Sequence, residues 1–271
     1  MLGVNKSDQL KLTDLLKNKA KGILYPYLTL SIMELLVECF TNKAGIKNSI
    51  IQFLSLDGIG PLWFLPTLFF ATIIWYFVKQ FKNVVRISCF LVAIATIMSL
   101  YFVPNVPYAY AYIITRSVYV AIFMLLGNLF YNHLKLIQKY IHIVIVIGIL
   151  AYIYGVYYFN HYSFDLHFAQ ISKPISYWFI TLGTSLLWIT IVNQLNIDIL
   201  NRVLSFIGKN TLIILEGHWI LLQLIISPYL KMLPIEKNIL ELLNCIVIFI
   251  ILIPIIKIVN QKMKWIIKPI H

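Results

Sequence analysis

The chain alternates long apolar stretches with short polar connections, and this alternation is its dominant pattern. Each stretch is close to the ~20 residues that an α-helix needs to cross the hydrocarbon core of a bilayer. The fold class is therefore predicted to be all-α, a polytopic membrane bundle of about eight transmembrane helices. The predicted spans are at about 23–41, 61–79, 87–104, 109–131, 139–159, 175–194, 211–227 and 239–257.

Basic segments flank the predicted membrane domain, which covers residues 23–258. In residues 1–22, leucines alternate with lysines at helical spacing, which predicts a basic amphipathic segment on the anionic cytoplasmic leaflet. A solvated cytoplasmic tail is the alternative for this segment. The N-terminal stretch lacks the apolar core of a signal peptide, so membrane insertion is expected to begin with the first span. Residues 259–271 are predicted to form a basic cytoplasmic tail.

The distribution of Lys and Arg predicts the orientation in the membrane. With the N-terminus inside and eight crossings, sixteen Lys and Arg residues fall in inner segments and five in outer ones, while Arg116 lies within a helix. Cytoplasmic connections of membrane proteins are enriched in these residues. Both termini are therefore predicted to be cytoplasmic, and the helix that begins near residue 61 enters from the outer side.

Composition supports a membrane protein and argues against a soluble one. Hydrophobic residues make up 61% of the 271 and charged residues only 12%, whereas soluble domains have about 25% charged residues. The net charge of +12 is explained by the cytoplasmic bias, so no nucleic-acid partner is predicted. The expected partner is the lipid bilayer. The three cysteines show no metal or redox spacing.

Ionisable residues inside predicted spans are the first candidates for function, because charge is costly in hydrocarbon. Glu34 lies ~16 Å along the first span and Arg116 ~10 Å in from the outer end of the fourth. Both depths fall in the outer half of the membrane, which predicts an ion pair, with Glu38 one turn beyond Glu34. The pair is either catalytic or serves only to hold helices together.

The seventh predicted span carries Glu216 and His218 near its middle. At i, i+2 on a helix they are expected to face different neighbours, and Gly217 between them permits close approach of another helix. Glu216 is a candidate for lining a substrate site. His218 is a candidate general base, since histidine accepts protons near neutral pH; the alternative is a hydrogen-bonding core residue.

Two further stretches contain polar or turn-forming residues. Gly58, Gly60 and Pro61 precede an apolar helix, and Trp63 at its start suits a membrane interface, so this stretch predicts an anchored helix entry. Trp63 is a candidate for lining a substrate site. Elsewhere, residues 161–167 contain two histidines and an aspartate, but a fourth ligand is absent nearby, and no metal is predicted.

Several segments together resemble the acyltransferase 3 family of membrane-bound sugar O-acyltransferases, in particular its fucose O-acetylase-like subgroup. The resemblance rests on four runs in matching order across about 200 residues. These are Pro61-Leu62-Trp63-Phe64-Leu65-Pro66, Tyr25-Pro26-Tyr27-Leu28, Leu125-Leu126-Gly127-Asn128-Leu129, and Phe206-Ile207-Gly208-Lys209-Asn210-Thr211-Leu212 with His218 following.

The resemblance implies transfer of an acetyl or other acyl group from acetyl-CoA or another acyl-CoA. The acceptor would be a hydroxyl of an extracytoplasmic, cell-surface glycan or its precursor, and the protein would lie in the cell membrane. Family members usually have ten membrane helices, and the first carries a basic residue followed, after ten residues, by a histidine taken as catalytic. No Lys or Arg here has a histidine at that separation, so the first two family helices are expected to be missing.

His218 is then the best remaining candidate for catalysis, followed by Glu34 and Arg116, with Trp63 and Glu216 lining the substrate site. Two alternatives stay open. One is a membrane transporter of a lipid or small solute, which intramembrane charges and prolines also suit. The other is a non-catalytic remnant of the family.

Overall fold

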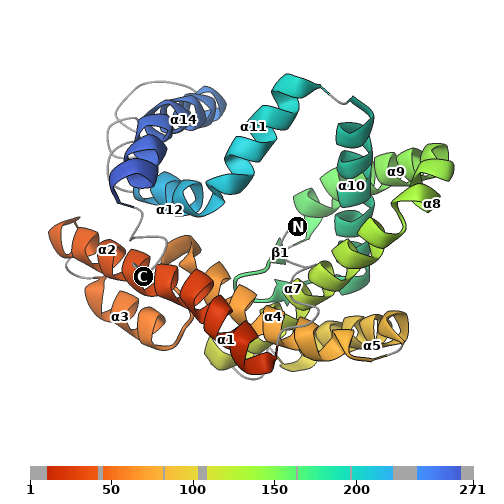
Figure 1. Ribbon diagram of the computed structural model, residues 1–271, viewed down its shortest axis with the longest axis horizontal. Coiled ribbons are helices and arrows are strands. Elements are labelled where there is room, and N and C mark those ends of the chain that lie inside the picture. Colours follow the sequence, from red (N-terminus) through yellow and green to blue (C-terminus); the bar gives the residue numbers. More distant parts are fainter. Residues whose placement is uncertain are drawn as a thin grey trace. The chain divides into compact units, whose positions relative to one another are not determined.

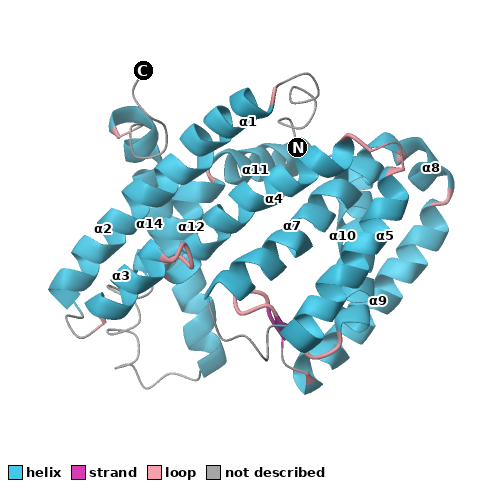
Figure 2. Ribbon diagram, turned by 90° about the horizontal axis from the view of Figure 1, so that it is seen from below, coloured by secondary structure: helices cyan, strands magenta, loops and turns pink. Residues whose placement is uncertain are grey.

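The structure is a computed structural model, and it describes residues 11–41, 45–81, 83–102, 109–162, 164–195, 197–221 and 237–263 (Figure 1). Helices dominate this part of the chain, with one short pair of strands (Figure 2). The chain divides into two compact units, described in turn. The first unit contains Met1–Leu12 and Thr67–Asp198, and the second contains Thr13–Pro66 and Ile199–His271.

All eight apolar stretches of the sequence contain helices in the described residues. Six of these helices are long and apolar enough to cross a membrane, and the remaining two, Ile87–Leu100 and Thr211–Leu221, are shorter. The predicted polytopic helical membrane protein is confirmed. The cytoplasmic location of both termini stays a prediction. The six long helices are Leu12–Cys39, Gly60–Lys79, Tyr112–Asn132, Ile141–His161, Pro174–Leu195 and Leu242–Lys262.

The second unit begins with one continuous helix. Helix α1 (Leu12–Lys19) passes through a π-helical stretch, Ala20–Leu24, into α2 (Tyr25–Thr41). Pro26 lies just beyond this stretch, and a proline inside a helix lacks the N–H that the preceding turn needs, which accounts for the local change in winding. The helix crosses the predicted boundary at residue 22 without a break. The location of residues 1–22 on the cytoplasmic leaflet stays a prediction.

The next two segments of this unit pack on α2. Helix α3 (Ile46–Leu54) returns along it, where the Tyr27 ring stacks on Phe53 at 5.7 Å and the Tyr27 hydroxyl donates to the Phe53 carbonyl at 2.8 Å. A 3₁₀ turn, Gly60–Trp63, then leads into α4 (Phe64–Lys79). The unit is completed by three later helices, which are α11 (Asp198–Lys209), α12 (Thr211–Leu221) and α14 (Lys237–Lys262).

The first unit contains the central spans. After α4 come α5 (Val84–Ile97) with a π-helical end, Met98–Phe102, then α7 (Ala109–Asn132), α8 (Leu134–Lys139) and α9 (Ile141–His161). A two-stranded antiparallel hairpin, β1 (Phe164–Asp165) and β2 (Gln170–Ile171), connects α9 to α10 (Pro174–Leu195).

Helices α9 and α10 pack closely along their length. A Cβ added at Gly183 would lie 2.4 Å from the Cβ of Ala151, and one added at Gly148 would lie 2.6 Å from the Cβ of Leu187. Small residues therefore let these two helices approach, as is common where apolar helices associate inside a bilayer.

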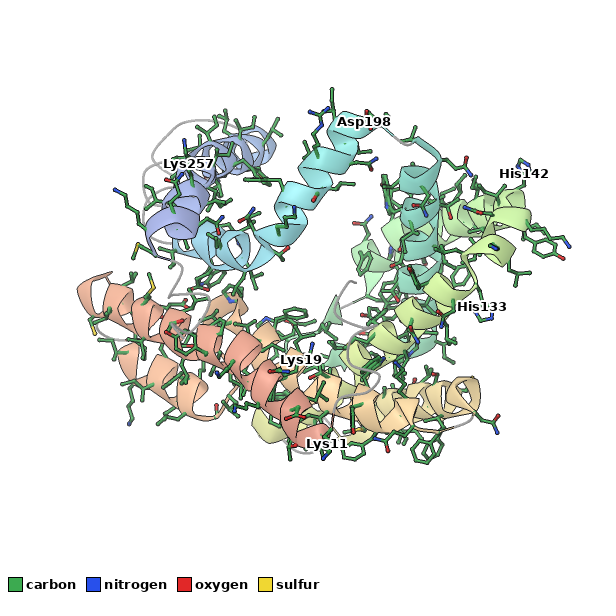
Figure 3. All side chains as sticks on the ribbon, viewed as in Figure 1. Lys11, Lys19, His133, His142, Asp198 and Lys257 are labelled. Atoms are coloured by element: carbon green, nitrogen blue, oxygen red, sulfur yellow. The ribbon has the colours of Figure 1, made fainter. Side chains whose placement is uncertain are left out.

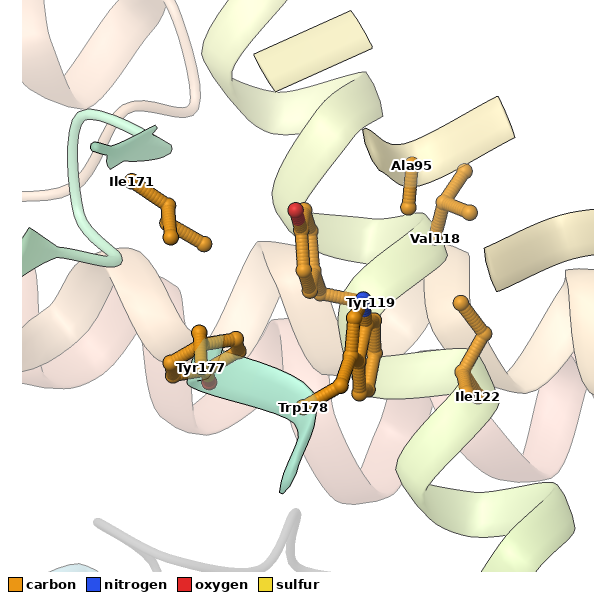
Figure 4. Packing of buried hydrophobic residues seen from close by; sticks show 7 residues of the cluster. All are labelled: Ala95, Val118, Tyr119, Ile122, Ile171, Tyr177 and Trp178. Carbon is orange, nitrogen blue, oxygen red and sulfur yellow. The ribbon is translucent and has the colours of Figure 1, made fainter. Parts of the chain in front are cut away.

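An aromatic cluster forms the core of the first unit (Figure 4). The Tyr119 ring stacks on Trp178 with centroids 4.9 Å apart, and its edge meets Tyr177 at 5.8 Å. The Tyr119 hydroxyl reaches Ser99 Oγ at 2.9 Å, which satisfies the polar end of a fully buried ring. This cluster joins α5, α7, β2 and α10.

Candidate functional site

The second unit holds a buried carboxylate, Glu34, on the α2 part of the continuous α1–α2 helix. Glu34 is only 3% exposed, and its Oε1 accepts a hydrogen bond of 2.8 Å from the indole Nε1 of Trp219 on α12. A buried carboxylate needs donors, because the loss of hydration is otherwise uncompensated. The bond joins two helices that are 185 residues apart in the chain, and it fixes the orientation of the Trp219 indole.

The turn before α4 closes over this indole. Gly58 and Gly60 both have positive φ, at +81° and +50°, and a Cβ at Gly60 would lie 2.3 Å from Trp219 Nε1. A Cβ at Gly58 would lie 2.1 Å from the backbone nitrogen of Trp63. Both positions therefore require glycine, for conformation and for space. The predicted helix entry is thus also the surface against which Trp219 packs.

Glu216 lies one turn before Trp219 on α12, so the two side chains share a helix face. It is 3% exposed, and its carboxyl group lies within hydrogen-bonding reach of that of Glu34. In the described part of the chain, neither Glu216 oxygen nor Glu34 Oε2 receives a hydrogen bond from an N–H or O–H group. Two carboxyl groups in contact can form a hydrogen bond only when one of them carries a proton.

The imidazole of His218 is held by its own helix. Its Nδ1 lies 2.8 Å from the carbonyl oxygen of Ile214, and because a carbonyl only accepts, Nδ1 carries the proton. In the neutral ring Nε2 is then the acceptor, on a half-buried side chain. Two exposed histidines, His133 and His161, make the same bond to the carbonyl four residues earlier. What distinguishes His218 is its position on the helix that carries Glu216 and Trp219.

Helix α12 is itself fixed against α14. A Cβ at Gly217 would lie 2.6 Å from Leu252 Cδ2, so the glycine permits the close helix approach that the sequence predicts. At the start of α12, Asn260 Nδ2 donates to Asn210 Oδ1 at 2.7 Å, and Asn210 is 7% exposed. An apolar layer between these helices contains Ile213, Leu221, Ile248, Leu252 and Ile256.

Arg116 occupies a different environment, in the first unit. It is fully buried on α7, and its Nη1 donates to the carbonyl oxygen of His167 at 2.9 Å. His167 lies in the turn of the β-hairpin, where the Asp165 carboxylate accepts the backbone N–H groups of His167 and Phe168 at 2.8 and 3.3 Å. Arg116 therefore anchors the hairpin turn. The predicted Glu34–Arg116 ion pair joins residues of separate units and stays a prediction.

Two of the possible metal ligands in the segment at 161–167 make local hydrogen bonds. Asp165 caps the turn, and His161 bonds to the Tyr157 carbonyl of its own helix. Among the described residues, no three His, Cys, Asp or Glu side chains are grouped as a metal would require. Nearby, the hydrogen bond from the Lys173 ammonium to the Tyr162 hydroxyl raises the pKa of Lys173 above its ordinary value.

Comparison with known proteins assigns the family. The family model described as "Acyltransferase domain" matches residues 3–260, nearly the whole chain. The chain belongs to the acyltransferase 3 family. No curated protein and no solved structure matches it. The resemblance found in the sequence is thereby confirmed, and the six long apolar helices agree with a multi-pass membrane acyltransferase.

Within this acyltransferase, the second unit gathers Glu34, Glu216 and the helix entry at Trp63 with the helix that bears His218. The Trp63 ring is half-buried and meets Phe64 edge to face at 6.0 Å. In the first unit, a groove of about 580 Å³ along α9 and α10 is lined by Tyr152, Phe159, Thr184 and Trp188 among others, and contains none of the predicted site residues.

Two important residues of this region escaped sequence reasoning. Trp219 was not singled out as a hydrogen-bond donor, although its spacing of three residues from Glu216 places both on one face. Gly60 was seen only as a turn residue, and its contact with Trp219 involves a partner far along the chain. A tryptophan N–H in the middle of an apolar helix needs an acceptor, and that requirement was the available signal.

Proposed function

We propose that this chain transfers an acetyl or other acyl group from acyl-CoA to a hydroxyl of an extracytoplasmic glycan or its precursor, in the cell membrane. Support comes from the family match over residues 3–260 and from the position of His218 on α12. Acyl-CoA is the donor substrate, and the acceptor is a sugar hydroxyl. The proposed reaction between this donor and this acceptor uses no metal.

His218 is the proposed general base. With Nδ1–H donated to the Ile214 carbonyl, the free lone pair is on Nε2. Nε2 takes the proton of the acceptor hydroxyl while that oxygen attacks the thioester carbonyl carbon. The tetrahedral intermediate collapses with cleavage of the carbon–sulfur bond, and the thiolate of coenzyme A leaves and takes up the proton. The products are an ester and a free thiol, so atoms and charges balance.

The surrounding residues are proposed to position this base and shape its site. The bond from Trp219 to Glu34 and the packing of Gly60 on the indole hold α12 in place, and His218 precedes Trp219 directly. Misplacement of a catalytic group by about 1 Å can cost about a hundredfold in rate. Trp63, in the same turn as Gly60, is proposed to line the acceptor site.

Transfer of labelled acetyl groups tests the proposal. The full chain would be expressed in a strain that lacks its own copy, and membrane vesicles would receive labelled acetyl-CoA. Label is expected in the glycan fraction as an alkali-labile ester. His218→Gln should lower the rate by about 10²–10⁴-fold, as expected for loss of a general base. His133→Gln is the matched control, because His133 makes the same bond to its own helix but is exposed.

The outcomes separate the two parts of the proposal. Transfer that persists in His218→Gln at the wild-type rate would remove His218 from the base role and leave acyl transfer intact. Failure of the well-folded wild-type chain to esterify any glycan fraction, with acetyl-CoA and longer acyl-CoA donors, would contradict the function itself. In that case uptake or release of a solute by the same vesicles would favour a transporter.

A further inference from the structure

Helix α11 is the most sharply two-sided helix in the second unit. At about 100° per residue, its apolar and polar side chains occupy two separate arcs with no mixing. The apolar arc contains Ile199, Leu200, Val203, Leu204, Phe206 and Ile207. The polar arc contains Asp198, Asn201, Arg202, Ser205, Gly208 and Lys209.

The apolar arc is uncovered in the part of the chain that the structure describes. Ile199 is 71% exposed, Val203 48% and Phe206 44%, and every residue of α11 from Asn201 to Lys209 is exposed. A row of large apolar side chains along one face of a helix is unfavourable in water, since each costs about 1.5–3 kcal/mol relative to burial. A partner that accepts an apolar face is therefore required.

The position of α11 in the chain identifies that partner as lipid. It follows α10, a membrane span, after only two residues, and a single residue separates it from the apolar helix α12 (Figure 1). Its start, Asp198, is labelled in Figure 3. Twelve residues of helix reach ~18 Å, too short for a ~30 Å hydrocarbon core. A short amphipathic helix between two apolar ones is suited to lie in the interface plane.

The polar arc carries the charge that such a location needs. Arg202 and Lys209 are seven residues apart and lie on the same side, against one acidic residue, Asp198, at the N-terminal end. The sequence assigns this connection to the cytoplasmic side, where anionic lipids attract Lys and Arg by about 1 kcal/mol each.

We propose that α11 lies in the cytoplasmic interface, with its apolar arc among acyl chains and Arg202 and Lys209 at anionic lipid headgroups. Its C-terminal end is tied to the membrane bundle, because Asn210 Nδ2 donates to the Phe206 carbonyl at 2.8 Å and Asn210 Oδ1 accepts from Asn260 at 2.7 Å. Lipid at α11 thereby fixes the depth of α12. This inference does not depend on acyl transfer.

Site-directed spin labelling of the full chain tests the location. The cysteines at 39, 89 and 245 would be replaced by serine, and a single label attached in Val203→Cys or Ser205→Cys, on opposite arcs of one helix. The chain would be reconstituted in nanodiscs of phosphatidylcholine with phosphatidylglycerol. Oxygen should relax the label at 203 more than a water-soluble nickel chelate does, and the reverse should hold at 205.

Two results would overturn the location. Equal access of the nickel chelate to both positions would place the helix in water. Shielding of position 203 from both reagents would mean that protein, not lipid, covers the apolar arc. Because the two labels share a helix, misfolding would affect both and would not produce the expected contrast.

Lipid selectivity tests the charges separately. The preference of the full chain for spin-labelled phosphatidylglycerol over phosphatidylcholine should fall by roughly fivefold for each of Arg202→Gln and Lys209→Gln, if each charge contributes about 1 kcal/mol. Asn201→Gln, on the same arc, is the uncharged control and should leave the preference unchanged. An unchanged preference in the double variant would refute binding of anionic lipid by these two residues.

Discussion

Trp219 Nε1 donates a 2.8 Å hydrogen bond to Glu34 Oε1, so a tryptophan on α12 supplies the partner for a buried acid on α2. The indole can only donate, so this bond satisfies its N–H and one of the two oxygens of Glu34. The same indole nitrogen is packed against Gly60. Residues of α2 and of the turn before α4 thus both contact Trp219 Nε1 on α12. These contacts hold α12, the helix that carries His218, in place.

Trp219→Phe should destabilise the chain by about 1–3 kcal/mol, because the change retains a ring but leaves the buried Glu34 oxygen without its donor. Thermal unfolding in detergent would measure the loss. Trp188→Phe is the matched control, since Trp188 is 57% exposed on the α9–α10 groove. Equal stability of Trp219→Phe and Trp188→Phe would show that the bond to Glu34 contributes nothing.

Gly60→Ala should destabilise the chain by more than the addition of a single methyl group suggests. A residue with a Cβ at φ +50° costs about 1–2 kcal/mol, and the added carbon would lie 2.3 Å from Trp219 Nε1. Part of the loss should therefore disappear in a Trp219→Phe background, as expected for residues in contact. Gly208→Ala, where nothing lies within 4 Å, should be neutral or stabilising by up to about 1 kcal/mol. Strictly additive effects would contradict the contact.

Much of the fold could be predicted from the sequence, because the length of an apolar stretch depends only on consecutive residues. Eight apolar stretches gave eight helical regions, and the glycine–proline run before Trp63 correctly indicated a helix entry. Gly217 was correctly expected to permit close approach of another helix, here α14. Helix α11 was not predicted and was treated as a connection. Its apolar and polar residues recur with the helical period, but it is more polar on average than a membrane span.

The contacts of the candidate residues could be predicted far less well. Sequence depth placed Glu34 and Arg116 in the same half of the membrane, but depth does not specify a partner. Glu34 accepts a hydrogen bond from an indole 185 residues away, and Arg116 donates one to a backbone carbonyl. Backbone acceptors leave no mark on composition, so the bond from Arg116 to a carbonyl could not be predicted from the sequence, and the ion pair itself stays a prediction.

Glu216→Gln should maintain or increase stability. The two carboxyl groups lie within hydrogen-bonding reach, and a glutamine amide supplies permanently the donor that a protonated acid would supply, for a gain of up to about 1.5 kcal/mol. Glu216→Ala should instead lose stability, because it leaves a cavity and an unpartnered Glu34 oxygen. Thermal unfolding of both variants at neutral pH would measure the two changes in stability. A glutamine variant as unstable as the alanine variant would show that the carboxyl groups do not share a hydrogen bond.

Gly183→Val should separate α9 from α10 and reduce stability by about 1–3 kcal/mol through overpacking. The added Cβ would lie 2.4 Å from the Cβ of Ala151, which has no rotamer by which to move away. Gly127→Ala, with nothing within 4 Å, is the control for introducing a side chain at a helical glycine. Disulfide cross-linking between cysteines introduced on α9 and α10 would report the separation, and an unchanged cross-linking rate would argue against close packing at Gly183.

The Asn210–Asn260 bond should show measurable coupling between α12 and α14. Both side chains are amides, and Asn260 donates to Asn210 Oδ1 at 2.7 Å while Asn210 Nδ2 bonds the Phe206 carbonyl. In membrane proteins such bonds average about 0.6 kcal/mol, with a maximum near about 1.7 kcal/mol. A double-mutant cycle with Asn210→Ala and Asn260→Ala would isolate this energy from the cost of each truncation. We expect Asn210→Ala to be the more damaging single change, because it also removes the bond to α11. A coupling energy of zero would mean that the two helices are held together by their apolar layer alone.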